Sequence, residues 1–190
     1  TALVLFIVEY NMFTGLIPLS LCKSSGLIEV SIGNNQFNST IPSCLGSLGV
    51  LVTFLDVSYN LLSGNIPNSL NNMYDLYVVL LSTNFFTGDI SSVFTNITTL
   101  HTVDISNNGF SGGLPLAVFT PELNTFVATK NCYHQSLSSE MCNAAFVKIL
   151  SLSGLNAGYN CANIIRLFGH AIHGENTVQG NDLVYIVYSI

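Results

Sequence analysis

The sequence predicts an α/β solenoid, a right-handed superhelix with a parallel β-sheet on its concave face and short helical or irregular returns on its convex side. Three observations predict it. One asparagine recurs every 23 to 25 residues along most of the 190-residue chain, apolar residues stand at fixed positions before it, and a turn signal follows it. A repeat that cannot bury its apolar face alone buries it against its neighbours, so we expect one continuous core.

The recurring asparagines, called the asparagine ladder below, set the period. They are Asn11, Asn35, Asn60, Asn84, Asn108 and Asn131. An apolar residue stands three, five and eight residues before each of them, as Ile32, Val30 and Leu27 do before Asn35. This alternation is the period of a strand with one buried face, and such strands stacked in parallel build a sheet over a core. Each asparagine is expected to end a strand.

A turn and a return are expected after each asparagine. An apolar residue follows at the second position, often with glycine at the fourth, and then Ile or Leu precedes Pro. Those pairs are Ile17-Pro18, Ile41-Pro42, Ile66-Pro67 and Leu114-Pro115, whereas the Asn84 repeat has Ile90-Ser91. Glycine lets the chain reverse within a few residues and proline stiffens the segment that follows.

The segment 55–70, LDVSYNLLSGNIPNSL, resembles the plant-type extracellular leucine-rich repeat with its signature L-x-x-N-x-L-x-G-x-I-P. Similar units run from Leu3 to about Val118, and weaker ones continue to about Leu155. The chain is therefore similar to receptor-like proteins and polygalacturonase-inhibitor proteins. This resemblance implies that the ladder asparagines bond to backbone groups of the turns, with each amide acting as donor and acceptor.

Two regions are predicted. Residues 1–155 form about seven leucine-rich repeats, of which the last two are degenerate, because the Gly and Pro signals vanish after Leu123 and Leu155 takes the place of the asparagine. Residues 156–190 are expected to form a C-terminal cap with a closing strand at 183–190, since a solenoid must shield its last apolar layer. No comparable cap precedes Leu3. Its apolar edge is expected either to be exposed or to pack on missing repeats or a partner subunit, and we favour missing repeats.

Composition limits the classes of function. Charged residues make up only 7% of the chain, and its four Lys and Arg residues at a net charge of −6 are too few to neutralise a row of phosphates, which excludes a nucleic-acid partner. The mean hydropathy is high at +0.53, yet no run of about 18 apolar residues exists, so no transmembrane segment is predicted in this chain. No signal peptide is recognisable, and the chain is expected to be a fragment or a processed product.

Five cysteines fall into two groups. Cys22 and Cys44 lie on the return side of adjacent coils, where a disulfide can form, although two separate buried thiols are the alternative. In the region of the predicted cap, Cys142 and Cys161 are the first choice for a second pair, with Cys132 left over. No C-x-x-C pair exists, so metal binding by these cysteines is disfavoured.

Two N-glycosylation sequons occur, beginning at Asn38 and Asn96. Neither belongs to the asparagine ladder, and both fall outside the expected strands, where an N-linked glycan would not disturb the sheet. Together with the cysteines and the repeat type, they favour an extracellular or cell-surface location.

No catalytic, cofactor or metal site is predicted. His170 and His173 stand three residues apart, but no H-E-x-x-H pattern accompanies them. Asp56 and Asp104 are expected on the exposed side of the sheet, two strands and roughly 10 Å apart. An inverting glycosidase uses a similar separation, yet aspartate is common at this position of the repeat, which favours a structural role. We therefore expect a protein that is not an enzyme.

A ligand is expected on the concave face, where the residues between the core positions should point. Our candidate ligand-binding residues are Tyr10, Phe54, Asp56, Tyr59, Tyr77, His101 and Asp104. Aromatic side chains supply contact area at a small entropy cost, although their preference for strands is an alternative reason for their presence. The predicted function is recognition of a protein, peptide or glycan. The alternative is a structural subunit of a cell-surface or filamentous assembly, packing against copies of itself or other subunits, which the scarcity of charge and the uncapped first repeat favour.

Overall fold

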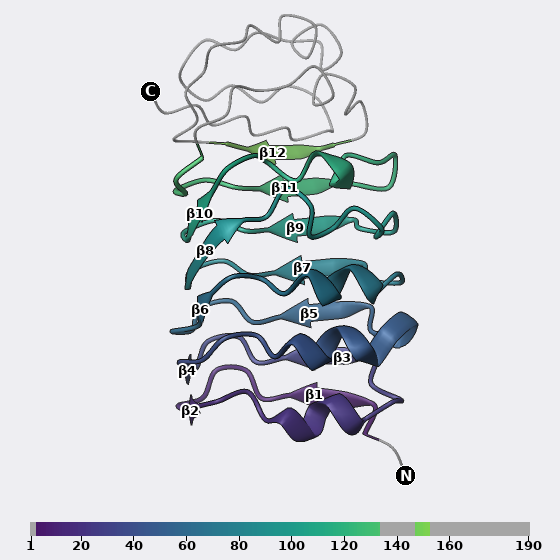
Figure 1. Cartoon of the computed structure of the whole chain (residues 1–190), viewed down its shortest axis with the longest axis vertical. Helices are drawn as coiled ribbons and strands as arrows, with labels where there is room; N and C mark the ends of the chain where they lie inside the picture. Colours follow the sequence, from purple (N-terminus) through teal and green to yellow (C-terminus); the bar gives the residue numbers. More distant parts are fainter. Residues whose placement is uncertain (1–2, 134–146, 153–190) are drawn as a thin grey trace, which may run out of the picture.

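The computed structural model describes residues 3–133 and 147–152, and it confirms the predicted solenoid (Figure 1). Each repeat contributes one strand to a seven-stranded parallel sheet with the order β1-β3-β5-β7-β9-β11-β12. The strands are β1 (Leu5–Ile7), β3 (Glu29–Ser31), β5 (Phe54–Asp56), β7 (Val78–Leu80), β9 (Thr102–Asp104), β11 (Thr125–Val127) and β12 (Ile149–Ser151). Strand order follows chain order, so each coil packs on the coil before it.

A second row of short strands follows the asparagine ladder. One pair joins β2 (Thr14–Gly15) to β4 (Gln36–Phe37), and a three-stranded sheet joins β6 (Ser63–Gly64), β8 (Phe85–Asp89) and β10 (Gly109–Ser111). In Figure 1 these strands run along one side of the stack, at the ends of the main strands. Gly15, Gly64, Gly88 and Gly112 all take positive φ here, between 75° and 85°, which only glycine adopts without strain. The second row thus bends each coil towards its return.

The returns are 3₁₀ helices. They are η1 (Leu19–Lys23), η2 (Ser43–Leu51, broken at Gly49), η3 (Asn68–Asn72) and η4 (Leu116–Val118). A proline caps each of them, and its carbonyl accepts the first bond, as that of Pro67 does from the Leu70 N–H at 3.0 Å. In the Asn84 repeat, where Ser91 replaces proline, residues 91–96 form turns instead. The Val93 N–H still bonds the Ile90 carbonyl at 3.1 Å, so proline favours the helix but the first turn forms without it.

The core is a column of apolar side chains through the coils. Register pairs Val30 with Leu55, Leu55 with Val79, and Val79 with Val103, and all four are at most 1% exposed. The aromatic residues that follow the ladder asparagines form a second column, in which the Phe86 and Phe110 rings stack at 6.1 Å. Equivalent residues therefore contact each other from coil to coil, which explains why the sequence period is so regular.

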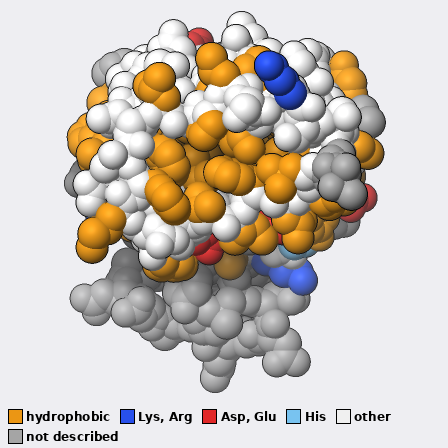
Figure 2. Space-filling view, turned by 90° about the horizontal axis from the view of Figure 1, so that it is seen from below, with side chains coloured by type: hydrophobic (Ala, Val, Ile, Leu, Met, Phe, Trp, Pro, Cys, Tyr) orange, Lys and Arg blue, Asp and Glu red, His pale blue; other side chains and the backbone are white. Residues whose placement is uncertain are grey.

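The first repeat leaves an apolar end exposed in the described part of the chain. Figure 2 looks at the stack from this end and shows hydrophobic side chains gathered over its middle. The large hydrophobic residues at least 42% exposed in the first repeat are Leu3, Val4, Leu5, Ile7, Tyr10, Met12, Phe13, Leu16 and Leu19. Towards the other end, β12 is the last described strand. The expected cap at 156–190, its closing strand at 183–190, Cys142, Cys161, His170 and His173 lie outside the described residues.

Candidate binding surface

The ladder asparagines join consecutive coils through their side chains. Asn60 donates to the carbonyl of Ile32 in the preceding coil at 3.0 Å and to those of Val57 and Ser58 in its own coil. Its Oδ1 accepts the N–H of Phe37 at 3.0 Å. The same pattern holds at Asn35, Asn84, Asn108 and Asn131. Asn11 is exposed and bonds only the carbonyls of Val8 and Glu9. The five ladder residues from Asn35 to Asn131 thus satisfy backbone groups on both sides of the amide and leave none of it for a ligand.

The residue before each ladder asparagine takes the left-handed conformation. These residues are Tyr10, Asn34, Tyr59, Thr83, Asn107 and Lys130, with φ between 51° and 57°. A residue in this conformation cannot continue a strand, so Tyr10 and Tyr59 lie in the turns beyond β1 and β5. Tyr77 and His101 each stand six residues before the left-handed residue of their own coil. Six residues of extended chain span about 20 Å. The seven candidate residues therefore do not form a single strip.

Three of the candidate residues lie at the other end of the strands, in successive coils, and two of them are in contact. We call Phe54, Tyr77 and His101 the aromatic patch. The Tyr77 and His101 rings stack with centroids 4.7 Å apart and planes at 22°. The His101 N–H bonds the Tyr77 carbonyl at 2.9 Å, and Phe54 lies one coil earlier, in register with Val78, the residue after Tyr77. Tyr77 remains 46% exposed, while Phe54 and His101 are half-buried. This surface can pack an apolar or aromatic group of a ligand.

Asp56 is not exposed, and this part of the sequence prediction is wrong. Its side chain is only 8% exposed, since Oδ1 accepts the N–H of Ser58 at 2.8 Å and the carboxylate lies over Gly33. A Cβ added to Gly33 would lie 2.8 Å from Oδ2, so the absence of a side chain makes room for the carboxylate. Burial raises the pKa of Asp56 above its ordinary value, against the lowering effect of the Ser58 hydrogen bonds. Ser31, Ser58, Ser82 and Ser106 are buried on the same side of the sheet.

Asp104 is half-buried and also bonds within its own coil. Its Oδ1 accepts the backbone N–H of Ser106 at 3.0 Å and the Ser106 hydroxyl at 2.6 Å. In the register of the sheet, Leu80 lies between Asp56 and Asp104. In the second coil, the Ser31 hydroxyl donates to the carboxylate of Glu9 in the first coil. Within residues 3–133 and 147–152, no three His, Cys, Asp or Glu side chains are grouped to hold a metal ion. The middle of the sheet face is therefore a row of locally satisfied polar groups.

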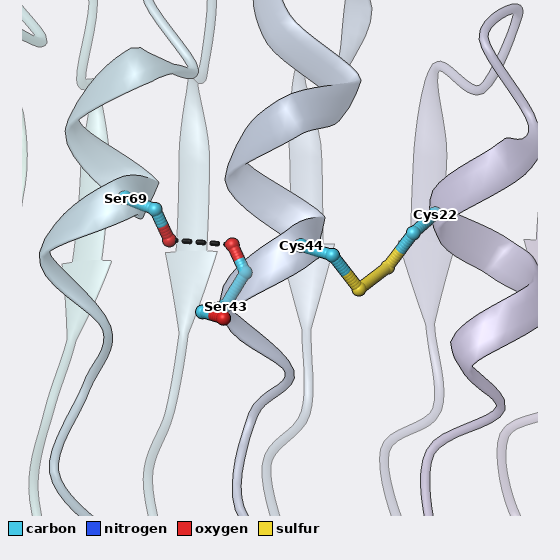
Figure 3. Close-up of a disulfide and its surroundings, with 4 residues drawn as sticks. All are labelled: Cys22, Ser43, Cys44 and Ser69. Carbon is cyan, nitrogen blue, oxygen red and sulfur yellow. Dashed lines mark hydrogen bonds between the residues drawn. A yellow bond between two sulfur atoms is a disulfide. The ribbon is translucent and has the colours of Figure 1, made fainter.

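The disulfide and the two N-glycosylation sequons lie away from the strands of the main sheet. Cys22 and Cys44 form a disulfide that joins η1 to η2 with a Cα–Cα distance of 5.6 Å (Figure 3). The Ser69 hydroxyl continues this link to the next coil by donating to the Ser43 carbonyl at 2.6 Å. Both sequon asparagines, Asn38 after β4 and Asn96 in the return of the Asn84 repeat, are exposed.

The sequence reasoning missed a hollow on the edge of the stack. It has a volume of about 500 Å³ and is lined by Asn84, Phe85, Thr87, Asn107, Asn108, Gly109 and Lys130. We call it the edge hollow. It combines residues directly before the ladder asparagines with residues directly after them, and only the first group stands at positions expected on the concave face. The residues directly after them are Met12, Gln36, Leu61, Phe85, Gly109 and Cys132, so a glycine beside a phenylalanine was the signal that could have found it.

Comparison with known proteins agrees with this architecture. The sequence model of the Leucine Rich Repeat family matches residues 26–48, 52–73 and 99–120. No helix within the described part of the chain has the length and apolar character to cross a membrane. These segments of the chain are thus leucine-rich repeats.

The relatives with similar sequences include plant receptor-like proteins. Receptor-like protein 35 of Arabidopsis thaliana is 34% identical over 175 residues, which is 80% of this chain and 18% of that protein. Receptor-like protein 32 from the same plant is 38% identical over 60 residues, or 32% of this chain and 7% of that protein. The chain thus spans less than a fifth of the length of these relatives.

Solved structures give the same result. The PEPR1–AtPEP1 complex superposes with a TM-score of 0.76 at 31% identity, over 80% of this chain and 21% of that one. The ectodomain of the Arabidopsis receptor kinase HAESA, bound to an IDA peptide hormone, gives 0.73 at 29% identity, over 82% and 26%. The repeats are those of plant receptor-like proteins and receptor ectodomains, and this likeness confirms the expected extracellular or cell-surface location. The absence of catalytic activity stays a prediction.

Proposed function

We propose that this chain is part of an extracellular recognition domain that binds a peptide or a protein segment on the exposed face of its seven-stranded sheet. The aromatic patch carries the proposal. Candidate residues of three successive coils lie at this end of the sheet face, two of them with stacked rings, and Tyr77 offers 46% of its surface. Aromatic anchors of this kind contribute much of the binding energy at protein interfaces.

Two further observations support the sheet face. HAESA, whose ectodomain this chain resembles, was solved with a peptide hormone. Both exposed sequon asparagines lie off the sheet strands, so N-linked glycans at Asn38 and Asn96 would leave the aromatic patch open. The polar row of Asp56 and Asp104 lies beside the patch along the same strands and presents few free groups. We therefore expect the partner to be held mainly by apolar contact, with backbone atoms of the peptide over the serine-rich centre.

A peptide-display selection tests this proposal. Random peptides selected for binding to the 190-residue chain would be measured against Tyr77→Ala and against Tyr74→Ala. The second variant is a matched control, because Tyr74 is 45% exposed but lies between η3 and β7. We expect Tyr77→Ala to weaken binding about tenfold or more and Tyr74→Ala to leave it unchanged. Equal effects of the two variants, or none from Tyr77→Ala, would overturn the proposal.

The second candidate function is a structural subunit. The scarcity of charge favours it, because only 7% of residues are charged and a surface so neutral and apolar tends to associate. Its test is the size of the particle that the purified chain forms. Ordered multimers of defined size would support this alternative, and a monodisperse monomer would count against it.

A further inference from the structure

The edge hollow has a floor where a side chain is missing. In the first, third and fourth repeats, the residue directly after the ladder asparagine is a large apolar one, namely Met12, Leu61 and Phe85. Gly109 occupies this position in the fifth repeat and pairs with Thr87 of β8. A Cβ added to Gly109 would lie 3.2 Å from the Phe86 carbonyl oxygen and from the Thr87 side chain, so glycine lets the two coils approach closely at the floor of the hollow. Phe85 is 62% exposed at its border.

The polar side chains around the hollow are largely unoccupied. Lys130 is exposed, and within the described residues it takes part in no side-chain hydrogen bond or ion pair. Asn107 makes only one long contact, 3.5 Å to the Thr83 hydroxyl. A cation and an amide thus stand beside an exposed aromatic ring, in a chain with ten Asp and Glu but four Lys and Arg. This arrangement complements an apolar group that has a carboxylate next to it.

The backbone of the hollow decides which carboxylate it suits. The N–H groups of Phe85, Asn107 and Asn108 all bond carbonyls within the solenoid. A chain terminus is typically captured by several free backbone N–H groups, which these residues do not offer. The hollow is also shallow and open along the edge of the stack, so a peptide can pass over it. An acidic side chain within a continuous segment therefore fits better than a C-terminal carboxylate.

We propose that the edge hollow is a second binding site, which takes a partner segment with a Glu or Asp side chain adjacent to an apolar one. The apolar side chain packs on Phe85 above Gly109, and the carboxylate bonds Lys130 with help from Asn107. This site is separate from the aromatic patch, because it lies in the turns after the strands rather than at their beginning. It goes beyond the proposed function of the sheet face and does not depend on it.

Blocked tripeptides test the site on the full chain. Acetyl-Leu-Glu-Leu-amide would be titrated to about 10 mM while the backbone amide resonances of the chain are followed by NMR. Acetyl-Leu-Gln-Leu-amide is the control without a carboxylate, and the free acid acetyl-Leu-Gln-Leu is the control whose only carboxylate is at the C-terminus. We expect the Glu peptide to shift the amides of Phe85, Gly109 and Lys130. Absence of binding, equal binding of the Glu and Gln amides, or preference for the free acid would overturn the proposal.

Variants separate the two contacts. Lys130→Gln should weaken the Glu peptide about threefold and leave the Gln peptide unchanged, as expected of an exposed ion pair. Phe85→Ala should weaken both peptides, and Lys23→Gln, an exposed lysine in η1, is the matched control. All three residues are exposed, so the variants should unfold at the temperature of the parent chain. An equal effect of Lys23→Gln and Lys130→Gln would contradict a local site.

Discussion

At the residue scale, the ladder asparagines show how one side chain can set the period of a whole fold. Each amide serves backbone groups that the turn leaves without partners, in its own coil and in the preceding one. Such buried groups cost free energy when they are unpaired, so the asparagine is required wherever a coil is covered on both sides. The end of the ladder differs, because Asn11 is exposed and no described coil lies beneath it.

The two kinds of ladder position give a matched test. Asn60→Ala should lower the free energy of unfolding by about 2 kcal/mol, because it leaves the Phe37 N–H buried and unpaired, while the Ile32 carbonyl keeps only its bond from Asn35. Asn11→Ala should cost under about 1 kcal/mol, since water can replace its exposed bonds. Urea unfolding of both variants measures the difference. Equal losses would show that the asparagine acts through turn propensity and not through burial.

The buried carboxylate of Asp56 predicts a dependence of stability on pH. Burial raises its pKa in the folded state above the ordinary value of 3.8, so the folded chain binds this proton more tightly than the unfolded chain. Stability therefore falls as pH rises through 3.8 towards the folded-state pKa. Asp56→Asn removes this loss and keeps an oxygen for the Ser58 N–H. We expect the stability of Asp56→Asn relative to the parent to increase from pH 3 to pH 7 in urea unfolding. A difference that is constant or shrinks would contradict it.

The exposure and the conformation of single residues on the sheet face could not be predicted from the spacing pattern. The strand period gave the side of the sheet on which Asp56 lies but not its exposure, because exposure depends on Gly33 in the neighbouring coil and on the Ser58 N–H. Likewise, the period placed Tyr59 and Tyr77 on one face, although Tyr59 takes φ of 51° and lies in the turn. Neighbour contacts and turn conformation are not contained in a spacing pattern.

At the scale of elements, the returns between the strands were only partly predictable from the sequence. The prolines predicted the start of each 3₁₀ helix, and the repeat that lacks one forms turns over 91–96. The returns were predictable as short and irregular because no helical period exists between the Ile-Pro pairs. The disulfide was left open, since Cys22 and Cys44 suit both a bond and two separate thiols until the spacing of η1 and η2 is known.

The disulfide should stabilise the first coils. It closes a loop over a sequence separation of 22 residues, for which the chain-entropy estimate is about 3 kcal/mol. We expect the double variant Cys22→Ser/Cys44→Ser to lose about this amount in urea unfolding, and the parent chain to lose a similar amount in reducing buffer. The double variant should be insensitive to the reductant. A parent chain equally stable with and without reductant would contradict a stabilising role.

At the scale of the whole molecule, the repeat makes the stack predictable in the middle and poorly predictable at its ends. Middle coils have identical neighbours on both sides, so one pattern of apolar and asparagine positions determines their packing. The first coil has a neighbour on one side only, and its described residues expose Leu5 and Ile7 to about half.

The exposed end predicts how the isolated 190-residue chain behaves. β1 pairs with β3 on one side only, and an unpaired edge beside apolar side chains promotes association. We expect concentration-dependent association of the parent chain in sedimentation velocity, and a shift to monomer in Leu5→Lys/Ile7→Lys, because charge at an edge strand opposes pairing. Tyr74→Lys, at a comparably exposed site away from this end, is the control. If the variant still forms multimers of a fixed size, another surface makes the contact and the structural-subunit alternative gains support. If the parent is monomeric at all concentrations, the apolar end does not drive assembly, and the recognition function of the sheet face stands as the simpler account.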